Sequence, residues 1–426
     1  MAEIRMRGFA KLTSIDEALN QFFASVHVGK LQSEDILIKA SLGRVLAKDI
    51  ICPRDVPPFN RSAMDGYAVK AEDVFGASET NPVILSVKGI SSVGKPSSEI
   101  LGRGEVMRIA TGAPMPEGAD AVVMVEFTEA TGPDKVEVYR PVAPSENISS
   151  RGEDVRKGQL ILRAGTFIKP QDMGIMAALG LTKVEVTKRP VVAVLSTGNE
   201  LVDLGSEVPP GKIVDSNRVT LLAMAEASGA EPADLGIVPD ERDVIIKRMR
   251  EGLASADLIL VSGGTSVGER DLLPDVVNSL GRPGVIVHGI AMRPGRPTAL
   301  CAVEGKPIIL LPGFPVAAMI AYEIFAESII LRMLGASTRL WERPTVRAEA
   351  LRRVPSSLGN RSFVRVIVMK KGGRYVFELL RATGSGIISS MVKANGMLII
   401  PENKEGVEEG EAAEVILLRP VEEGKE

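Results

Sequence analysis

Acidic residues follow three of the short apolar runs that the sequence predicts to be β-strands. These residues are Glu200, Asp240 and Asp271. In an open α/β sheet the carboxyl ends of neighbouring strands lie at one edge, and ligands bind there. Mg²⁺ prefers carboxylate oxygens and often completes its coordination with substrate phosphates. Because the chain has only two histidines and two cysteines, the pattern favours an oxygen-ligated Mg²⁺ over a zinc or iron site.

Each of these acidic residues also has a purely structural interpretation. Asp240 stands before a predicted helix, with Asp243 a little further on, so it can be the N-cap of that helix. Asp271 precedes another predicted helix and can cap it in the same way. Glu200 can be a solvated loop residue. The sequence leaves these alternatives open, since capping and metal binding can coexist at one residue.

A glycine-rich loop and two arginines add hydrogen-bond donors suited to anions. The loop at 262–268 follows the third apolar run and exposes backbone N–H groups before a helix, although such loops also occur for packing reasons alone. It matches neither the P-loop nor the G-x-G-x-x-G pattern. Arg293 and Arg296 offer planar guanidinium groups to phosphate or another tetrahedral oxyanion. For the two arginines, a solvated turn is the alternative.

Strands and helices alternate in the region that must position these residues. The predicted strands cover 190–196, 233–238, 257–262 and 307–311, and the predicted helices cover 218–228, 240–254 and the residues after Val316. Apolar strands joined by helices are typical of a doubly wound parallel sheet. The sequence therefore predicts an α/β domain with the candidate site at the carboxyl ends of its strands.

The rest of the chain predicts other kinds of domain. Residues 14–47 predict two helices, the first with Ser14 as its N-cap, and residues 171–181 predict a further helix. Across residues 52–150, short β-branched runs alternate with Gly, Pro and Ser turns, which is typical of an all-β domain. Short β runs return after Arg343, before a charged end.

Composition and charge exclude several classes of function. Lysine plus arginine number 51 against 54 acidic residues, so the net charge is −3, and aromatic residues make up only 4%. Neither the electrostatic footprint nor the stacking platform of a nucleic-acid-binding protein is present. The most apolar stretch, 307–322, is too short and too broken by proline to span a membrane. With two distant cysteines and no signal-like start, we expect a cytoplasmic protein.

Eight segments in order along the chain resemble the molybdopterin molybdenumtransferase family, which is related to the large domain of gephyrin. The segments are PPFNRSAMDGYAV, TGAPMPEGADAVV, SRGEDVRKG, VLSTGNEL, IVDSN, LILVSGGTSVGERD, RPGRP and LLPGFPVAA. They extend from about Pro57 to about Ala318, and the layout of the chain beyond them is also similar.

The resemblance implies a multidomain α/β plus β fold and an elongated homodimer. The implied domains are a discontinuous helical linker domain at 1–52 and 152–186, an inserted β domain at 53–151, a doubly wound molybdopterin-binding α/β domain at 187–337 and a C-terminal β-barrel at 338–426. The implied active site lies between the α/β domain of one subunit and the β domain of its partner.

The same resemblance assigns roles to individual residues. Glu200 and Asp240 look like Mg²⁺ ligands. The residues implied to be catalytic are Asp65, Thr111, Asp154 and Asp271. Those implied to bind substrate are Arg151, Ser262, Gly263, Gly264, Ser266, Arg293, Arg296, Pro312 and Pro315. Two residues depart from the family pattern, because Gly289 stands where relatives often have a basic residue and Phe314 where they often have asparagine.

The implied activity is insertion of molybdate or tungstate into adenylylated molybdopterin, with Mg²⁺-dependent release of AMP. One alternative is a molybdopterin adenylyltransferase, which resembles the α/β domain alone; the β regions before Ser150 and after Arg343 count against it. That enzyme is also a possible partner in contact with this one. Another alternative is a gephyrin-like scaffold that binds a partner at the dimer interface, but the intact acidic residues favour the enzyme.

Overall fold

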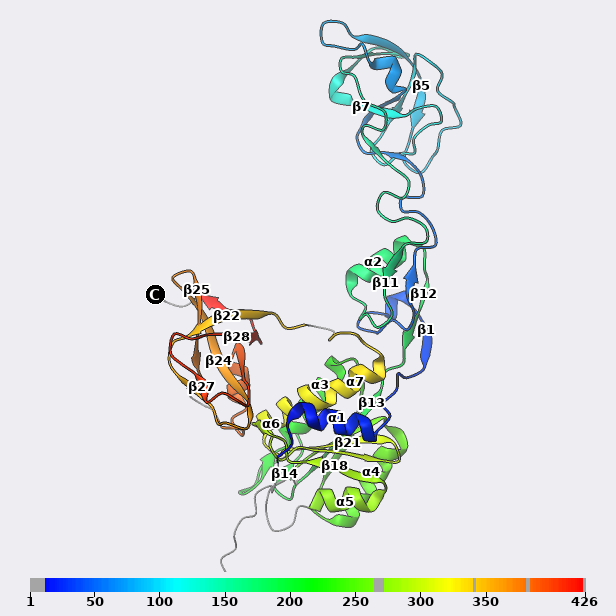
Figure 1. The fold of residues 1–426 in the computed structure, drawn as a ribbon. Coiled ribbons are helices and arrows are strands. Elements are labelled where there is room, and N and C mark those ends of the chain that lie inside the picture. Colours follow the sequence, from blue (N-terminus) through cyan, green and yellow to red (C-terminus); the bar gives the residue numbers. More distant parts are fainter. Residues whose placement is uncertain (1–11, 264–271, 340–341, 381–383, 424–426) are drawn as a thin grey trace, which may run out of the picture.

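The computed structural model describes residues 12–263, 272–339, 342–380 and 384–423. The chain is elongated, with the β domain at one end, a small linker unit next to it, and the α/β domain and barrel at the other end (Figure 1). Within the described ranges, no helix is long and apolar enough to cross a membrane.

A six-stranded sheet forms the α/β domain, in the order β16-β13-β17-β21-β20-β18. Strands β16, β13, β17 and β21 are parallel, which confirms the doubly wound prediction, while β20 pairs antiparallel with both β21 and β18; neither β20 nor β18 was predicted. The strands are β13 (Val191–Thr197), β16 (Glu231–Val238), β17 (Leu258–Ser262), β18 (Pro283–His288), β20 (Ala299–Val303) and β21 (Lys306–Leu311), and a small parallel pair comprises β14 (Leu201–Val202) and β15 (Ile213–Val214).

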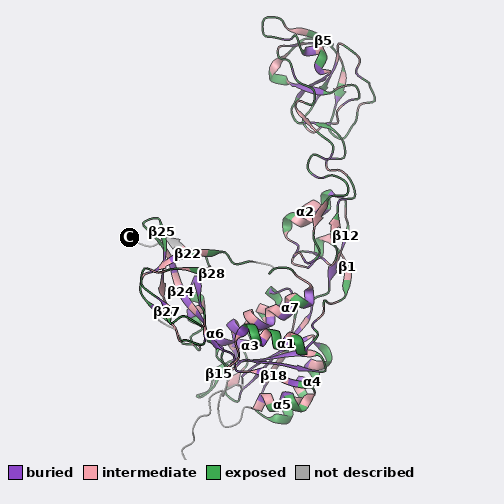
Figure 2. Cartoon of the chain, viewed as in Figure 1, coloured by how far each residue is buried: buried purple, intermediate pink, exposed green. Residues whose placement is uncertain are grey.

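Helices cover both faces of this sheet, because its parallel strands are apolar on both sides. In β13, Val192 and Val194 pack in one cluster, whereas Ala193 and Leu195 pack in the other. The first cluster includes residues of α1 (Ile15–Ser25), α3 (Ser216–Ala227), α6 (Pro315–Ala321) and α7 (Glu327–Leu334), and the second includes residues of α4 (Arg242–Ser255) and α5 (Leu272–Leu280). A π-helical turn, Tyr322–Ala326, joins α6 to α7. The buried strands lie between these helices (Figure 2).

The N-terminal segment differs from its prediction in one respect. Ser14 caps α1 as expected, since its hydroxyl accepts a hydrogen bond from the Glu17 amide. The second predicted helix is wrong, because β1 (Ser33–Leu37) and a 3-10 turn, Ile38–Ala40, occupy that part of the chain. Pairing of β1 with a distant strand outweighs the weak local preference for helix. Helix α1 packs on the α/β sheet, next to β18 and β20.

The linker unit is built from short paired strands and one helix. Its elements are β1, which pairs with β12 (Lys183–Thr187), β2 (Ile50–Ile51), which pairs with β11 (Leu160–Leu162), and α2 (Pro170–Ala178). Helix α2 confirms the helix predicted near residue 171.

The β domain contains a six-stranded sheet in the order β7-β4-β6-β5-β9-β8. Alternate residues of the central strand β4 enter two separate cores, with Tyr67 and Val69 in one and Ala68 in the other. The strands are β3 (Arg61–Ser62), β4 (Gly66–Val69), β5 (Val83–Ser91), β6 (Glu105–Ile109), β7 (Ala121–Met124), β8 (Thr128–Gly132), β9 (Lys135–Val138) and β10 (Ile148–Ser149), with 3-10 turns at Ala71–Val74 and Val125–Phe127.

The C-terminal barrel closes because its long strand β24 pairs with neighbours on both sides. The closed ring consists of β24 (Arg361–Lys371), β25 (Arg374–Leu379), β22 (Thr345–Ala350), β28 (Ala412–Leu417) and β26 (Gly396–Ile400), and the flanking elements are β23 (Val354–Pro355), α8 (Ser389–Lys393), β27 (Gly406–Val407) and β29 (Glu422–Glu423). A short strand of the α/β domain, β19 (Met292–Arg293), also pairs with β24. The two domains therefore share backbone hydrogen bonds.

Candidate functional site

The carboxyl ends of the parallel strands meet at one edge of the α/β sheet, as the sequence predicts. Ser262 at the end of β17 is in register with Ser196 of β13 and with Leu311 of β21. On the other side of β13, Thr197 is in register with Val238 of β16. The loops that carry the predicted site residues therefore begin side by side.

Close backbone packing explains the glycine at the start of the predicted anion-binding loop. Gly263 has a φ of +111°, and a Cβ atom built there would lie 2.0 Å from the carbonyl oxygen of Thr197. Any other residue would force two strand ends apart. The prediction that Gly263 takes part in substrate binding stays a prediction, and Gly264, Ser266 and Asp271 lie outside the described residues.

Asn217 at the start of α3 joins two of these loops. Its side-chain amide donates to the Ser262 hydroxyl at 2.7 Å and to the Gly313 carbonyl oxygen at 2.9 Å. Ser262 and Asn217 are both buried. Asn217 is the last residue of the motif IVDSN, and no role was predicted for it from the sequence. The glycine-rich loop and the Leu-Pro-Gly-Phe-Pro loop are thus held in a fixed relation by one side chain.

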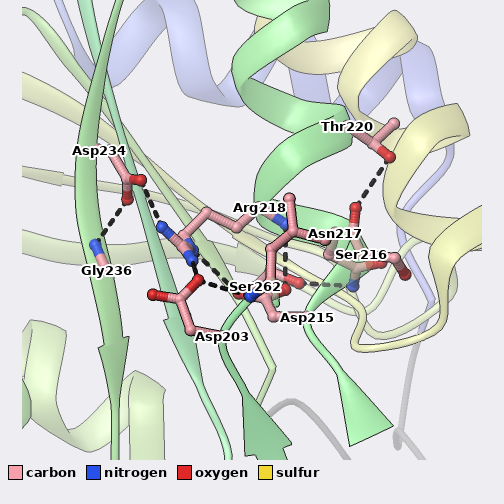
Figure 3. A network of polar contacts seen from close by, with 10 residues as sticks. Asp203, Asp215, Ser216, Asn217, Arg218, Thr220, Asp234, Gly236 and Ser262 are labelled. Carbon is pink, nitrogen blue, oxygen red and sulfur yellow. Dashed lines mark hydrogen bonds and ion pairs between the residues drawn. The ribbon is translucent and has the colours of Figure 1, made fainter. Parts of the chain in front are cut away.

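The helix that presents Asn217 is fixed by a buried guanidinium (Figure 3). Arg218 forms ion pairs with Asp203, Asp215 and Asp234, which come from three different segments. Burial alone would lower the pKa of Arg218, but the charges of Asp234, Asp203 and Asp215 outweigh it and raise that pKa. Asp215 is also the N-cap of α3. The first turn of α3 is therefore fixed to the loop after β14 and to β16.

The two predicted Mg²⁺ ligands lie on exposed loops at neighbouring strand ends. The Asn199 side-chain oxygen accepts a hydrogen bond from the Asp240 amide at 3.3 Å, which ties the loop that carries Glu200 to the loop after β16. The capping interpretation of Asp240 is wrong, because α4 has Glu241 as its N-cap residue, without a side-chain cap. The Asp240 side chain thus does not cap α4.

The donor set suits Mg²⁺ only if the substrate completes it. Among the described residues, no group of three or more His, Cys, Asp or Glu side chains could hold a metal ion. Mg²⁺ is commonly bound through one or two carboxylates together with substrate phosphates and water. Glu200 and Asp240 therefore fit a shared, substrate-dependent magnesium site and do not fit a permanent one.

A cavity of about 680 Å³ holds the two predicted arginines together with residues of the barrel. Arg293 donates to the Ser357 hydroxyl at 2.6 Å, and Arg296 donates to the Asn360 side-chain oxygen at 3.2 Å. Pairing of β19 with β24 places Arg293 opposite Ser362. The arginines are thus oriented by the barrel. The remaining predicted substrate-binding residues are a buried Pro312, which lines this cavity, and a half-buried Pro315, which begins α6.

The barrel contributes a third arginine, Arg365, to this cavity. This residue was not predicted from the sequence. Arg365 is 4% exposed, lies on β24 and donates to the carbonyl oxygen of Gly384 at 3.4 Å. Burial lowers its pKa, but an arginine stays protonated under ordinary conditions. Nothing in the local sequence distinguishes this residue from other arginines, because its position depends on closure of the barrel.

The backbone conformation at Gly289 disfavours the basic residue that relatives often have there. It is buried with a φ of +90° and its carbonyl oxygen accepts a hydrogen bond from the Thr13 amide. A basic side chain would be strained in this conformation. The cavity therefore takes its positive charge from residues other than 289.

The predicted residues Asp65, Thr111 and Arg151 of the β domain make local polar contacts. The Asp65 carboxylate accepts a hydrogen bond from the Thr111 amide at 2.8 Å, and both residues are exposed. The Arg151 guanidinium donates to Asp55 at 2.6 Å. The Lys157 amide and Arg151 together lower the pKa of Asp55. Asp154, just after the β domain, is exposed, and its amide donates to the Val56 carbonyl oxygen at 3.1 Å.

Within one chain, the β domain and the strand ends of the α/β domain lie far apart, with the linker unit between them (Figure 1). The loops of Glu200 and Asp240 start at the strand-end edge of the α/β sheet, Arg293 and Arg296 line a cavity against the barrel, and Asp65 and Thr111 are joined in the β domain. A multidomain α/β protein with an arginine-lined cavity and with exposed carboxylates at its strand ends defines a class that binds anionic small molecules.

Comparisons with known proteins identify the family. Residues 13–180 match the MoeA N-terminal region (domains I and II), residues 193–332 a probable molybdopterin-binding domain, and residues 347–418 the MoeA C-terminal region (domain IV). The chain is 35% identical to the molybdopterin molybdenumtransferase of Bacillus subtilis, over 95% of this chain and 94% of that protein. It is 39% identical to a putative molybdopterin biosynthesis protein of Methanocaldococcus jannaschii, over 91% and 92% of the two chains.

A solved structure agrees with these sequence matches. The molybdopterin biosynthesis MoeA protein of Pyrococcus horikoshii superposes with a TM-score of 0.82 at 33% identity, over 96% of this chain and all of that one. The chain belongs to the molybdopterin molybdenumtransferase (MoeA) family.

The buried ion-pair cluster allows a stability prediction. Arg218→Met removes the cation and leaves the Asp215 carboxylate, which is 2% exposed, without a charged partner. We expect a loss of about 3–5 kcal/mol at pH 7. Thermal melts of the variant and the wild type at pH 7 measure this loss; a variant as stable as the wild type would contradict this account.

The loop bridge allows a second prediction. Asn217→Ala leaves the Ser262 hydroxyl and the Gly313 carbonyl oxygen without their shared donor, and we expect a loss of about 1–3 kcal/mol. Thr220→Val is the matched control, because the Thr220 hydroxyl bonds only to the Ser216 carbonyl oxygen of the same helix. Chemical denaturation of both variants measures the effect. Equal stability of the two variants would show that the bridge contributes nothing.

Proposed function

We propose that this protein inserts molybdate or tungstate into adenylylated molybdopterin and releases AMP. The observation that carries the proposal is the arginine-lined cavity of the α/β domain, in a chain of this family that also carries two exposed carboxylates at the strand ends of the same domain. Molybdate, the phosphates of the dinucleotide-like substrate and the dithiolene are all anionic. Guanidinium groups held in fixed positions can bind such groups without reorganising when charge develops.

The residues of the chain have separate tasks in this scheme. Arg293, Arg296 and Arg365 would neutralise the oxyanion and the phosphate charge, since each is placed in the shared cavity. Glu200 and Asp240 would hold Mg²⁺, which supplies charge neutralisation at the pyrophosphate when it is bound. Positioning of the two substrates would supply much of the rate acceleration. Which oxyanion is natural, and that the reaction takes place in the cytoplasm, stay predictions.

We further propose that the complete site forms between two subunits. In the arrangement of Figure 1, the β domain lies far from the strand ends of its own chain, with the linker unit between them. The β domain of a partner subunit would bring its Asp65, Thr111 and Arg151, and the neighbouring Asp154, to the α/β domain in a two-fold dimer. A contact with the molybdopterin adenylyltransferase, which would deliver its product directly, also remains a proposal.

The adenylyltransferase and scaffold alternatives are less well supported. The relatives named molybdopterin molybdenumtransferase match over nearly the whole chain, including the β domain and the barrel. A scaffold would need neither the exposed carboxylates at the strand ends nor the arginine-lined cavity.

The first experiment measures AMP release from adenylylated molybdopterin with Mg²⁺ and with either oxyanion. We expect release to require molybdate or tungstate. Asp240→Asn should lower the rate on the order of 100-fold, because a charged ligand of the metal is lost. Asp243→Asn is the matched control, since Asp243 is a fully exposed carboxylate three residues further on, in the first turn of α4. Release without an oxyanion, or equal rates for the two variants, would contradict the proposal.

The intersubunit site predicts complementation between two inactive variants. Asp65→Asn and Asp240→Asn change different halves of the proposed site. In a mixed dimer, one of the two sites then combines an intact β domain with an intact α/β domain. After random mixing of subunits, roughly a quarter of the wild-type activity should return. If instead each site forms within one chain, mixing restores nothing. Each variant mixed with itself serves as the control.

A further inference from the structure

An exposed phenylalanine lies in the cavity that holds the arginines. Phe314 follows β21, lines the cavity with Arg293 and Arg296, and is 61% exposed. Large aromatic side chains usually bury most of their area, and in this chain they are few. A solvent-exposed ring beside guanidinium groups is a surface for a ligand that is both flat and anionic.

Phe314 also occupies a position where a different residue would stabilise the fold. It is the N-cap residue of α6 and provides no side-chain cap. Ser, Thr, Asp and Asn are preferred at this position because their side chains bond to free amides of the first turn. A residue that breaks a local rule without a structural gain is typical of a functional site.

The surroundings of Phe314 hold one side of the ring and leave the rest open. A Cβ atom built at Gly386 of the barrel would lie 3.2 Å from the ring, so the glycine backbone passes close to it. The Val316 amide donates to the Ser385 carbonyl oxygen at 3.1 Å, which fixes this loop against α6. Packing against the loop is therefore one function of the ring, but a purely structural phenylalanine would not stay 61% exposed.

We propose that Phe314 stacks on a flat heterocycle of the phosphorylated substrate. This inference rests on the proposed function and adds a residue that determines specificity within the same site. Adenylylated molybdopterin carries two flat rings, the pterin and the adenine, each connected to the phosphates. Arg293 and Arg296 bind the anionic part of the ligand and Phe314 binds its ring.

Binding measurements on separate probes test the stacking. The probes are AMP, molybdopterin and molybdate, each titrated alone against the full chain. Phe314→Leu should weaken binding of one ring-bearing probe by about tenfold, the usual scale for loss of a stacked aromatic partner. Phe314→Tyr keeps the ring and should restore the affinity. Molybdate has no ring, so its affinity should not change in either variant.

A matched control separates stacking from a general loss of exposed apolar area. Phe75→Leu changes another exposed phenylalanine, 59% exposed, in the β domain and away from the cavity. It should leave the affinity for all three probes unchanged.

The outcomes distinguish a Phe314 ring that stacks on the substrate from one that only packs against the loop. Weakening of AMP alone assigns the adenine to Phe314, and weakening of molybdopterin alone assigns the pterin. If the wild type binds AMP or molybdopterin and Phe314→Leu binds them with the same affinity, the stacking proposal is overturned and the proposed function stays intact. An equal loss for molybdate also overturns it, because the ring would then only maintain the shape of the cavity. If the wild type binds neither AMP nor molybdopterin, both the stacking and the proposed function are overturned.

Discussion

The arrangement of the site loops depends on a buried guanidinium that must be neutralised where it lies. Arg218 is largely withdrawn from water, and a buried cation is tolerated only with well-placed acceptors. Its carboxylate partners come from the loop after β14, from the cap of α3 and from β16. Asp203 and Asp234 remain partly exposed, so solvent screens the excess negative charge. Because these bonds fix the first turn of α3, Asn217 reaches Ser262 and Gly313 in a single geometry.

The arginine-lined cavity depends on backbone pairing between the α/β domain and the barrel. Strand β19 belongs in sequence to the α/β domain but pairs with β24 of the barrel. Met292 and Phe363 lie in the same hydrophobic cluster, so the core is continuous across the boundary. The barrel therefore positions Arg293 and supplies Arg365 and its serines. A barrel that moved freely would separate the arginines and weaken the cavity for any anion.

The sequence predicted the parts of this structure that depend on local pattern. The alternation of apolar strands and amphipathic helices fixed the order of the α/β domain, and the strand-end position of Glu200 and Asp240 followed from topology. Long-range pairing was not predictable in the same way. Residues 33–37 form a strand because they pair with β12, and β20 runs antiparallel to both of its neighbours because a two-residue turn joins it to β21. Arg365 and Asn217 were missed because only tertiary contacts bring them to the site.

The distance between the two halves of the site within one chain has a physical logic. Asp65 and Thr111 are fixed to each other on a compact β domain with its own cores, and the strand ends are fixed by α3 and the barrel. Each half is thus held by its own contacts, and the linker unit separates the two halves within one chain. In the proposed dimer, a substrate with separate phosphate, ring and oxyanion-binding parts would contact both halves at once. Preformed halves that meet across a subunit boundary would keep water out during reaction while leaving the site open for a large substrate to enter.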